Sequence, residues 1–125
     1  MPTVAKHTTE KVNEYPVAID RFSDLDGYTV NFVDITETHS LAPMLAGLPG
    51  GHCQCPHWGY LFRGRMIVHY EDHDDVIEQG QAFYMPPGHV PEADADTEFV
   101  LFSPTDELQA TEAAIATGMQ ASQTE

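Results

Sequence analysis

Short hydrophobic segments separated by turns run through most of this chain, and they limit the folds open to it. The clearest segment, residues 28–35, is rich in β-branched and aromatic side chains, with Val30 and Phe32 opposite Asn31. An Asp-Gly pair at 26–27, a common hairpin turn, precedes it. Further strands are expected at residues 15–19, 60–63, 65–70, 76–79, 81–85 and 99–103. Strands of this length and spacing predict an all-β antiparallel sandwich or barrel.

The length of 125 residues predicts a single domain with its own hydrophobic core. One late helix is expected to begin at Thr105, which suits an N-cap, and to end at Gly118, which favours a stop. The expected organisation is a lead-in or edge strand at 1–15, a β-barrel at 16–104, a helix at 105–118 and a disordered tail at 119–125.

Acidic residues outnumber basic residues by 20 to 5, which gives a net charge of −15. Nucleic acid needs Lys and Arg to neutralise its phosphates, so this composition argues against such a partner and favours solubility. No apolar run approaches the roughly 20 residues of a membrane span, and residues 1–6 lack the order of a signal peptide. We expect a cytoplasmic protein that binds no membrane and keeps its thiols reduced.

Residues 51–60 contain both cysteines, two of the seven histidines and the only tryptophan. In an extended strand, Cys53, Cys55 and His57 share one face, because successive side chains point to opposite faces. Two thiols and an imidazole in one row are typical of a partly built site for a soft metal. Core filling by buried cysteines is the structural alternative.

Three residues in the second half of the chain, Gly80, Pro86 and Gly88, have the spacing Gly-x5-Pro-x-Gly. This spacing resembles the second sequence motif of the cupin superfamily, which are small jelly-roll β-barrels. In that motif two further residues and then a histidine follow the second glycine, and this chain has Pro91 at the histidine position; His89 lies two residues before it. The resemblance implies a cupin-like jelly-roll β-barrel, a small-molecule pocket and metal site inside it, and a homodimer.

The first cupin motif, His-x-His, three or four residues, Glu, six residues and Gly, is matched only in part. Gly64 fits the closing glycine, which puts His57 at the glutamate position and Cys53 at the second histidine. The usual ligand set of the family therefore does not carry over unchanged. The site is either lost or rebuilt from Cys53, Cys55, His57 and His89, and the resemblance places the first three of these on the face that points into the barrel.

Thiolate and imidazole ligands favour tetrahedral zinc, with iron as the alternative divalent metal. Four protein ligands would make a closed structural site. Three ligands would leave a position open for water or substrate, where chemistry is possible.

Three more residues are candidates for substrate binding. Arg63 shares the strand parity of His57, so it is a candidate to orient an anionic substrate, or else it pairs with the acidic surface. Tyr84 and Met85 directly precede the proline-glycine turn, and we expect them to line the pocket.

Two apolar features have no catalytic interpretation. Trp58, Tyr60 and Phe62 alternate on the face opposite His57, and we expect them to pack on the other sheet or on a dimer partner. Residues 41–51 are apolar but interrupted by Pro and Gly, so they predict neither a helix nor a central strand. This loop is expected to cover the core, to line a pocket mouth or to pack on a second subunit.

Two functions remain open from the sequence. The first is a metal-dependent oxygenase, isomerase or lyase acting on a small molecule. The second is a non-catalytic binding or sensing protein with a closed zinc site. A third, weaker hypothesis makes Cys55 a nucleophile activated by His57 or His52, although no third group that orients the base is evident.

Overall fold

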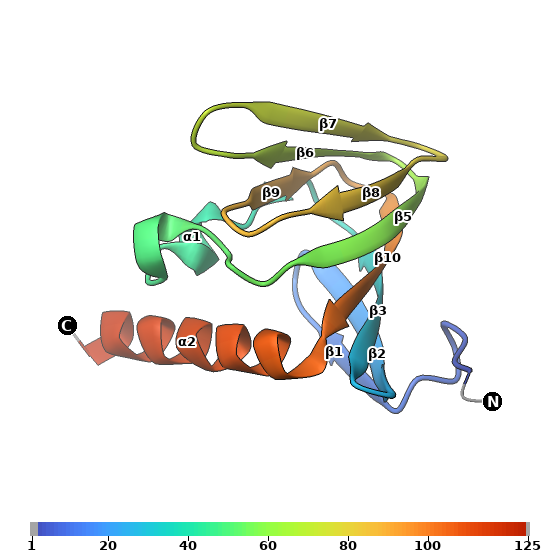
Figure 1. Cartoon of the computed structure of the whole chain (residues 1–125), viewed down its shortest axis with the longest axis horizontal. Helices are drawn as coiled ribbons and strands as arrows, with labels where there is room; N and C mark the ends of the chain where they lie inside the picture. The colour runs from blue at the N-terminus through green and yellow to red at the C-terminus, as the bar shows by residue number, and fades with distance from the viewer. Residues whose placement is uncertain (1–2, 125) are drawn as a thin grey trace.

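The computed structural model describes the backbone of residues 3–124 and the side chains of residues 3–48 and 50–116. Its strands form two antiparallel sheets that face each other (Figure 1). The larger sheet has the order β1 (Lys11–Glu14), β2 (Ala18–Leu25), β3 (Tyr28–Ile35), β10 (Thr97–Pro104), β5 (His57–Arg63) and β8 (Ala82–Met85). The smaller sheet has the order β4 (His39–Ser40), β9 (Val90–Ala93), β6 (Arg65–His69) and β7 (Asp74–Glu78). This is the predicted all-β, jelly-roll architecture.

The β2–β3 hairpin forms where the Asp-Gly pair predicted it. Asp26 and Gly27 both have positive φ angles, 48° and 87°. Two such residues make a turn whose twist matches the right-handed twist of the flanking strands. The turn sets a continuous register, from the Leu25–Tyr28 pair beside the turn to the Ala18–Ile35 pair at the far end of the hairpin.

Gly64 separates β5 from β6 and carries the chain from one sheet to the other. Its φ is 90°, in the left-handed region that favours glycine, and a β-carbon there would overlap the side chain of Thr97. The Thr97 hydroxyl oxygen accepts a hydrogen bond from the Arg65 amide, at 3.1 Å. The close approach explains why the first motif ends in glycine at this position.

The main core lies between the two sheets. Leu61 and Val68, one from each sheet, are completely buried. Shortening such a side chain to Ala typically costs about 2–5 kcal/mol of stability. The buried members of this cluster are Ala18, Ile35, Leu61, Met66, Val68, Ile77, Met85, Ala93 and Phe99.

Two helices flank one end of the sheets (Figure 1). The apolar loop forms the single-turn helix α1 (Ala42–Leu45) and a short 3-10 helix (Pro49–Gly51), although no helix was expected there. Pro43 is tolerated because it stands in the first turn, where its missing N–H is not needed. A second hydrophobic cluster joins α1 to α2 (Thr105–Thr124) and consists of Leu45, Leu48, Cys53 and Cys55, with Leu108 and Ile115 against it.

The ends of the chain differ in detail from the sequence expectation. Within residues 1–15, β1 forms an edge strand, and β2 begins only at Ala18. The helix does not end at Gly118 but continues to Thr124, through most of the segment expected to be disordered. Gly inside a helix costs only about 1 kcal/mol, which is too little to end it. Residue 125 lies outside the described residues. Among the described residues, the helices are too short or too polar to cross a membrane.

Candidate metal centre

Three segments of the chain converge on one buried group, formed by Cys53, His57 and His89. His57 is the first residue of β5, and His89 directly precedes β9. Cys53 forms an isolated antiparallel bridge with His89, in which the Cys53 amide donates to the His89 carbonyl at 3.0 Å. The Gly88 amide returns a bond to the Cys53 carbonyl at 2.8 Å. Backbone pairing therefore fixes the thiol beside the turn that carries His89.

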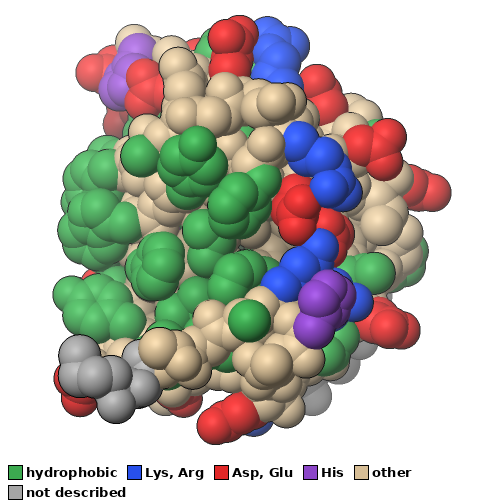
Figure 2. Space-filling view, turned by 90° about the vertical axis from the view of Figure 1, so that its right-hand side faces the viewer, with side chains coloured by type: hydrophobic (Ala, Val, Ile, Leu, Met, Phe, Trp, Pro, Cys, Tyr) green, Lys and Arg blue, Asp and Glu red, His purple; other side chains and the backbone are tan. Residues whose placement is uncertain are grey.

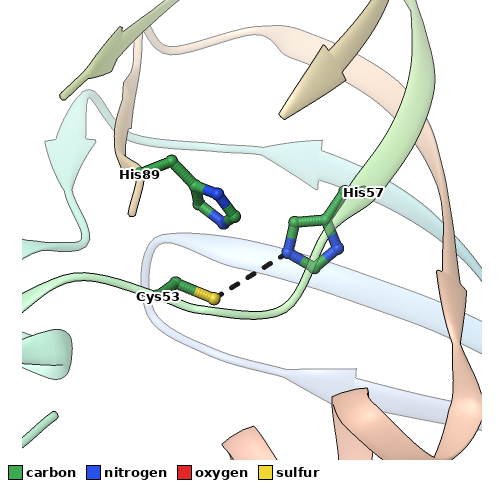
Figure 3. A group of neighbouring side chains, drawn as sticks. All are labelled: Cys53, His57 and His89. Carbon is green, nitrogen blue, oxygen red and sulfur yellow. Dashed lines mark hydrogen bonds between the residues drawn. The ribbon is translucent and has the colours of Figure 1, made fainter. Parts of the chain in front are cut away.

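The three side chains point toward one another (Figure 3). One ligand atom from each residue lies within 4.8 Å of the other two, and Cys53 Sγ is 4.0 Å from His57 Nε2. The two imidazole ring centres are 5.0 Å apart. All three residues are buried. This spacing is wider than a bound set of ligands but close enough for small side-chain shifts to contract it around one ion.

Both imidazoles are held through Nδ1, which leaves Nε2 for a ligand. His89 Nδ1 lies 2.7 Å from the Pro86 carbonyl oxygen, so Nδ1 must donate and Nε2 carries the lone pair. His57 Nδ1 lies 2.6 Å from the hydroxyl of Ser103, which is completely buried on β10. Anchoring of the second ring nitrogen is the usual support of a metal-binding histidine.

Burial keeps the imidazoles neutral, as metal ligation requires. It lowers the pKa of His57 to about 3, with a further contribution from His89. It also lowers the pKa of His89, against the opposing effect of the bond to Pro86. Burial raises the pKa of the Cys53 thiol, which a backbone hydrogen bond from Cys55 partly offsets. A metal ion would therefore have to displace one proton, from the thiol.

The group borders a cavity of about 670 Å³ between the sheets. The wall is largely apolar, and α1 and α2 contribute its remaining sides. Its apolar lining includes Val33, Ile35, Met66, Met85, Phe99 and Leu101. A cavity of this size accommodates a small organic molecule beside the three side chains.

Cys55 does not join the group, contrary to the expected row of three side chains. It is buried in the cluster with Leu45 and Leu48, and its thiol donates to the Pro56 carbonyl at 3.6 Å. Burial raises the pKa of Cys55 to about 12, with smaller contributions from Cys53 and acidic residues of α2. Strand alternation fails because β5 begins only at His57 and the preceding residues form an irregular turn that includes Pro56.

Arg63 lies outside the cavity and half exposed. Its guanidinium is 2.7 Å from Glu98 and 3.6 Å from Asp34, and it donates to the Asp96 carbonyl at 3.1 Å. This is the surface ion pairing weighed as the alternative to a substrate role. The β10–β5 pairing shifts register between Leu61 and Arg63, so the parity with His57 does not bring Arg63 inward.

Tyr84 and Met85 are neighbours in β8, so only one of them can face inward. Met85 is buried and lines the cavity, as expected. Tyr84 points outward, where its ring stacks on Trp58 with centres 4.9 Å apart. The expectation that both residues line the pocket is wrong for Tyr84.

Five aromatic side chains form a patch on the outer face of the larger sheet. Each is between 40% and 48% exposed, so they do not pack on the other sheet. Figure 2 shows hydrophobic side chains gathered on the left of this face, beside paired basic and acidic side chains. We call the five residues the aromatic patch: Trp58, Tyr60, Phe62, Tyr84 and Phe102.

Sequence reasoning missed Ser103, which anchors His57, and two polar residues of the cavity wall, Asp20 and Asn31. Ser103 stands at an inward position of a hydrophobic strand, which is an available signal for a buried hydrogen bond. Its partner was not predictable, because it depends on β10 pairing with β5.

Comparison with family models and with curated proteins found no match. Solved structures do match. KdgF from Halomonas sp. has a TM-score of 0.53 and 20% identity over 76% of this chain and 88% of that chain. The polyketide cyclase RemF from Streptomyces resistomycificus has a TM-score of 0.58 and 16% identity over 83% and 79%. An RmlC-like cupin from Shewanella frigidimarina has a TM-score of 0.55 and 13% identity over 81% and 88%.

These likenesses establish the fold: the chain is a cupin-fold protein. Its sequence is too distant from these structures for their individual activities to apply to it. Inside that fold, this chain carries a buried cysteine and two buried histidines in an arrangement that could hold a metal ion.

Proposed function

We propose that this protein binds a divalent metal ion through Cys53, His57 and His89 and acts on a small molecule in the adjoining cavity. The observation that carries the proposal is the convergence of three buried ligand atoms, with both imidazoles anchored through Nδ1. One thiolate and two imidazoles favour zinc, and iron is the alternative.

Three protein ligands support an enzyme rather than a structural metal site. A tetrahedral metal held by three side chains keeps one position for water or substrate, and the cavity adjoins the group. The metal would polarise an oxygen atom of the bound molecule or activate it toward proton transfer. An oxygenase, isomerase or lyase acting on a small molecule fits such a site.

The other two hypotheses have less support. A closed zinc site needs a fourth ligand, and the Cys55 thiol is not in the ligand group but donates to the Pro56 carbonyl. A Cys55 nucleophile needs a thiolate, whereas burial raises the pKa of this thiol to about 12. Burial of both free thiols is consistent with the reducing cytoplasm.

We further propose that the chain forms a homodimer through the aromatic patch. The five rings are uncharged on a molecule with a net charge of −15. Two copies repel each other over most of their surfaces, and the patch is where they can approach at low electrostatic cost. Exposed aromatic clusters of this kind mark protein interfaces, and the same patch on two copies is self-complementary about a two-fold axis.

Metal analysis of protein purified without a histidine tag tests the proposed centre. We expect about one metal ion per chain, lost in Cys53→Ser, and X-ray absorption showing one sulfur, two imidazoles and a non-protein oxygen ligand. Four protein ligands would support the closed site and contradict an enzyme. Absence of stoichiometric metal after exposure to zinc and to iron(II) would contradict both.

A further inference from the structure

The cavity has a second polar region, at the β2–β3 side of its wall. Asp20 of β2 and Asn31 of β3 both line the cavity. The Asn31 side-chain amide donates to both carboxylate oxygens of Asp20, at 2.9 and 3.2 Å. The pair is therefore held in place, and each carboxylate oxygen keeps a lone pair for another donor.

This pair and His57 of the metal centre lie on the same sheet. Asn31 is directly opposite Leu101 in the β3–β10 register. Two residues further along β10, Ser103 holds His57. One step along a strand face is about 7 Å, so the two polar regions are separated by about the width of an apolar side chain or two. Leu101 and Phe99 form the wall between and beside them.

Asp20 is a largely buried carboxylate without a described basic partner. Arg21 is the next residue, but it points to the opposite face and pairs with Asp34 at 3.3 Å. Burial raises the pKa of Asp20, while the hydrogen bond from Asn31 lowers it. A buried carboxylate is unfavourable unless its oxygens are hydrogen-bonded, and one amide group does not satisfy them fully.

The charge of the cavity lining selects among ligands. Three carboxylates line it, those of Asp20, Glu92 and Glu112, and its described lining includes no Lys or Arg. These carboxylates would repel an anionic group placed near them, whereas a metal ion at Cys53, His57 and His89 would attract one. Arg63 lies outside the cavity and does not offset the carboxylates. A largely apolar molecule with a hydrogen-bond donor fits the wall better.

We propose that Asp20 is a ligand-binding residue that accepts a hydrogen bond from a hydroxyl or amino group at one end of a mainly apolar molecule. The opposite end of that molecule lies at Cys53, His57 and His89. The inference rests on the proposed function, because it concerns the same cavity and names the chemistry of the molecule bound there. Asn31 positions Asp20 by holding both of its oxygens.

The test uses three probes that differ only in one end group: 4-phenylbutylamine, 4-phenylbutanol and 4-phenylbutyrate. Each is titrated into the isotope-labelled protein, zinc-loaded and zinc-free, and binding is followed by NMR. We expect saturable binding of the amine, the alcohol or both, with shifts at Asn31 and Leu101. Asp20→Asn should weaken amine binding about tenfold or more and alcohol binding about threefold, because it removes charge but keeps shape. Tighter binding of the amine than of the alcohol would identify a cationic group as the preferred donor.

A matched control is Asp94→Asn, which removes the same charge from an exposed site outside the cavity and should leave all three affinities unchanged. The butyrate can coordinate zinc but cannot donate to Asp20, so its affinity should not fall in Asp20→Asn. The inference is overturned if neither the amine nor the alcohol binds, or if Asp20→Asn binds them as wild type does. If Asp20→Asn does not fold, the titration of zinc-free wild-type protein tests the inference instead. Equal affinities of the butyrate and the amine in that titration contradict it.

The zinc content of each variant separates this inference from the proposed function. If Asp20→Asn retains zinc and binds the amine as wild type does, the proposed metal centre is supported and the proposed role of Asp20 is wrong. Failure of wild type to hold zinc contradicts the metal function, whereas the titration of zinc-free protein still reports on Asp20.

Discussion

The two faces of β5 carry opposite kinds of surface within seven residues. On the inner face, His57 and Leu61 are buried, and His57 is fixed by a buried hydroxyl next to a cysteine and a second histidine. On the outer face, Trp58, Tyr60 and Phe62 are uncharged, aromatic and almost half exposed. The comparison teaches that one strand can hold a polar side chain at a buried position and apolar side chains at exposed positions. Both departures from the usual pattern suggest binding, of a metal and ligand inside and of a second chain outside.

The largest expected effect comes from removing an inner-face ligand. His57→Ala should lower zinc affinity by about 1,000-fold or more, because it removes one of the three proposed metal ligands. Equilibrium dialysis or competition with a fluorescent chelator measures this. His69→Ala is the matched control, since His69 pairs with Asp74 at the exposed end of β6, and its zinc affinity should equal that of wild type.

The protonation state of the inner face predicts how zinc affinity depends on pH. Both imidazoles are neutral near pH 7 because burial lowers the pKa values of His57 and His89, whereas burial raises that of the Cys53 thiol. Zinc then displaces one proton, from the thiol. Affinity should rise about tenfold per pH unit between roughly pH 6 and 8. A slope near two, measured by the same competition assay, would mean that a histidine also loses a proton.

On the outer face, one added charge should weaken the proposed dimer without changing metal binding. Trp58→Glu should raise the dissociation constant of the dimer by about 30-fold, because it replaces an interface aromatic side chain with a charge on an already acidic molecule. Sedimentation velocity over a concentration series measures this. Val12→Glu on β1, which is equally exposed but outside the aromatic patch, should change little. A wild-type protein that sediments as a monomer at all concentrations would contradict the dimer.

A smaller effect is expected from the support of His57. Ser103→Ala removes the hydroxyl that fixes the ring and should weaken zinc binding by about tenfold. The control is Ser23→Ala, which removes another buried hydroxyl of the same sheet, one that accepts a bond from the Glu10 amide. Equal zinc affinity in Ser103→Ala and wild type would mean that the ring is oriented by packing alone.

The smallest change in metal binding is expected at the second cysteine. Cys55→Ala should leave the zinc content unchanged and lower the free energy of unfolding by about 1 kcal/mol, the cost of a small loss of buried volume. Metal analysis and chemical denaturation test the two parts separately. Loss of zinc would place Cys55 among the ligands and favour the closed site.

Much of the skeleton was predictable because local rules dictate it. The alternation in residues 28–35 specifies a half-buried strand, and Asp26-Gly27 specifies the turn before it. Gly64 stands where a side chain would overlap Thr97. Gly80, Pro86 and Gly88 mark turns of the cupin fold. The helix end was wrong because the cost of one glycine is small against continued helix formation up to Thr124.

Sequence alone determined the residue types at the centre: a cysteine before β5, a histidine at its start and a histidine after the proline-glycine turn. Only the tertiary structure decided between the two cysteines, because a backbone bridge to His89 fixes Cys53 while the Cys55 thiol donates to the Pro56 carbonyl. It also brought Ser103 and the β2–β3 hairpin with Asp20 and Asn31 into the same sheet as His57, because β10 pairs with both β3 and β5, which are far apart in the chain. Such pairings depend on how a whole sheet assembles, and no local pattern in the sequence encodes them.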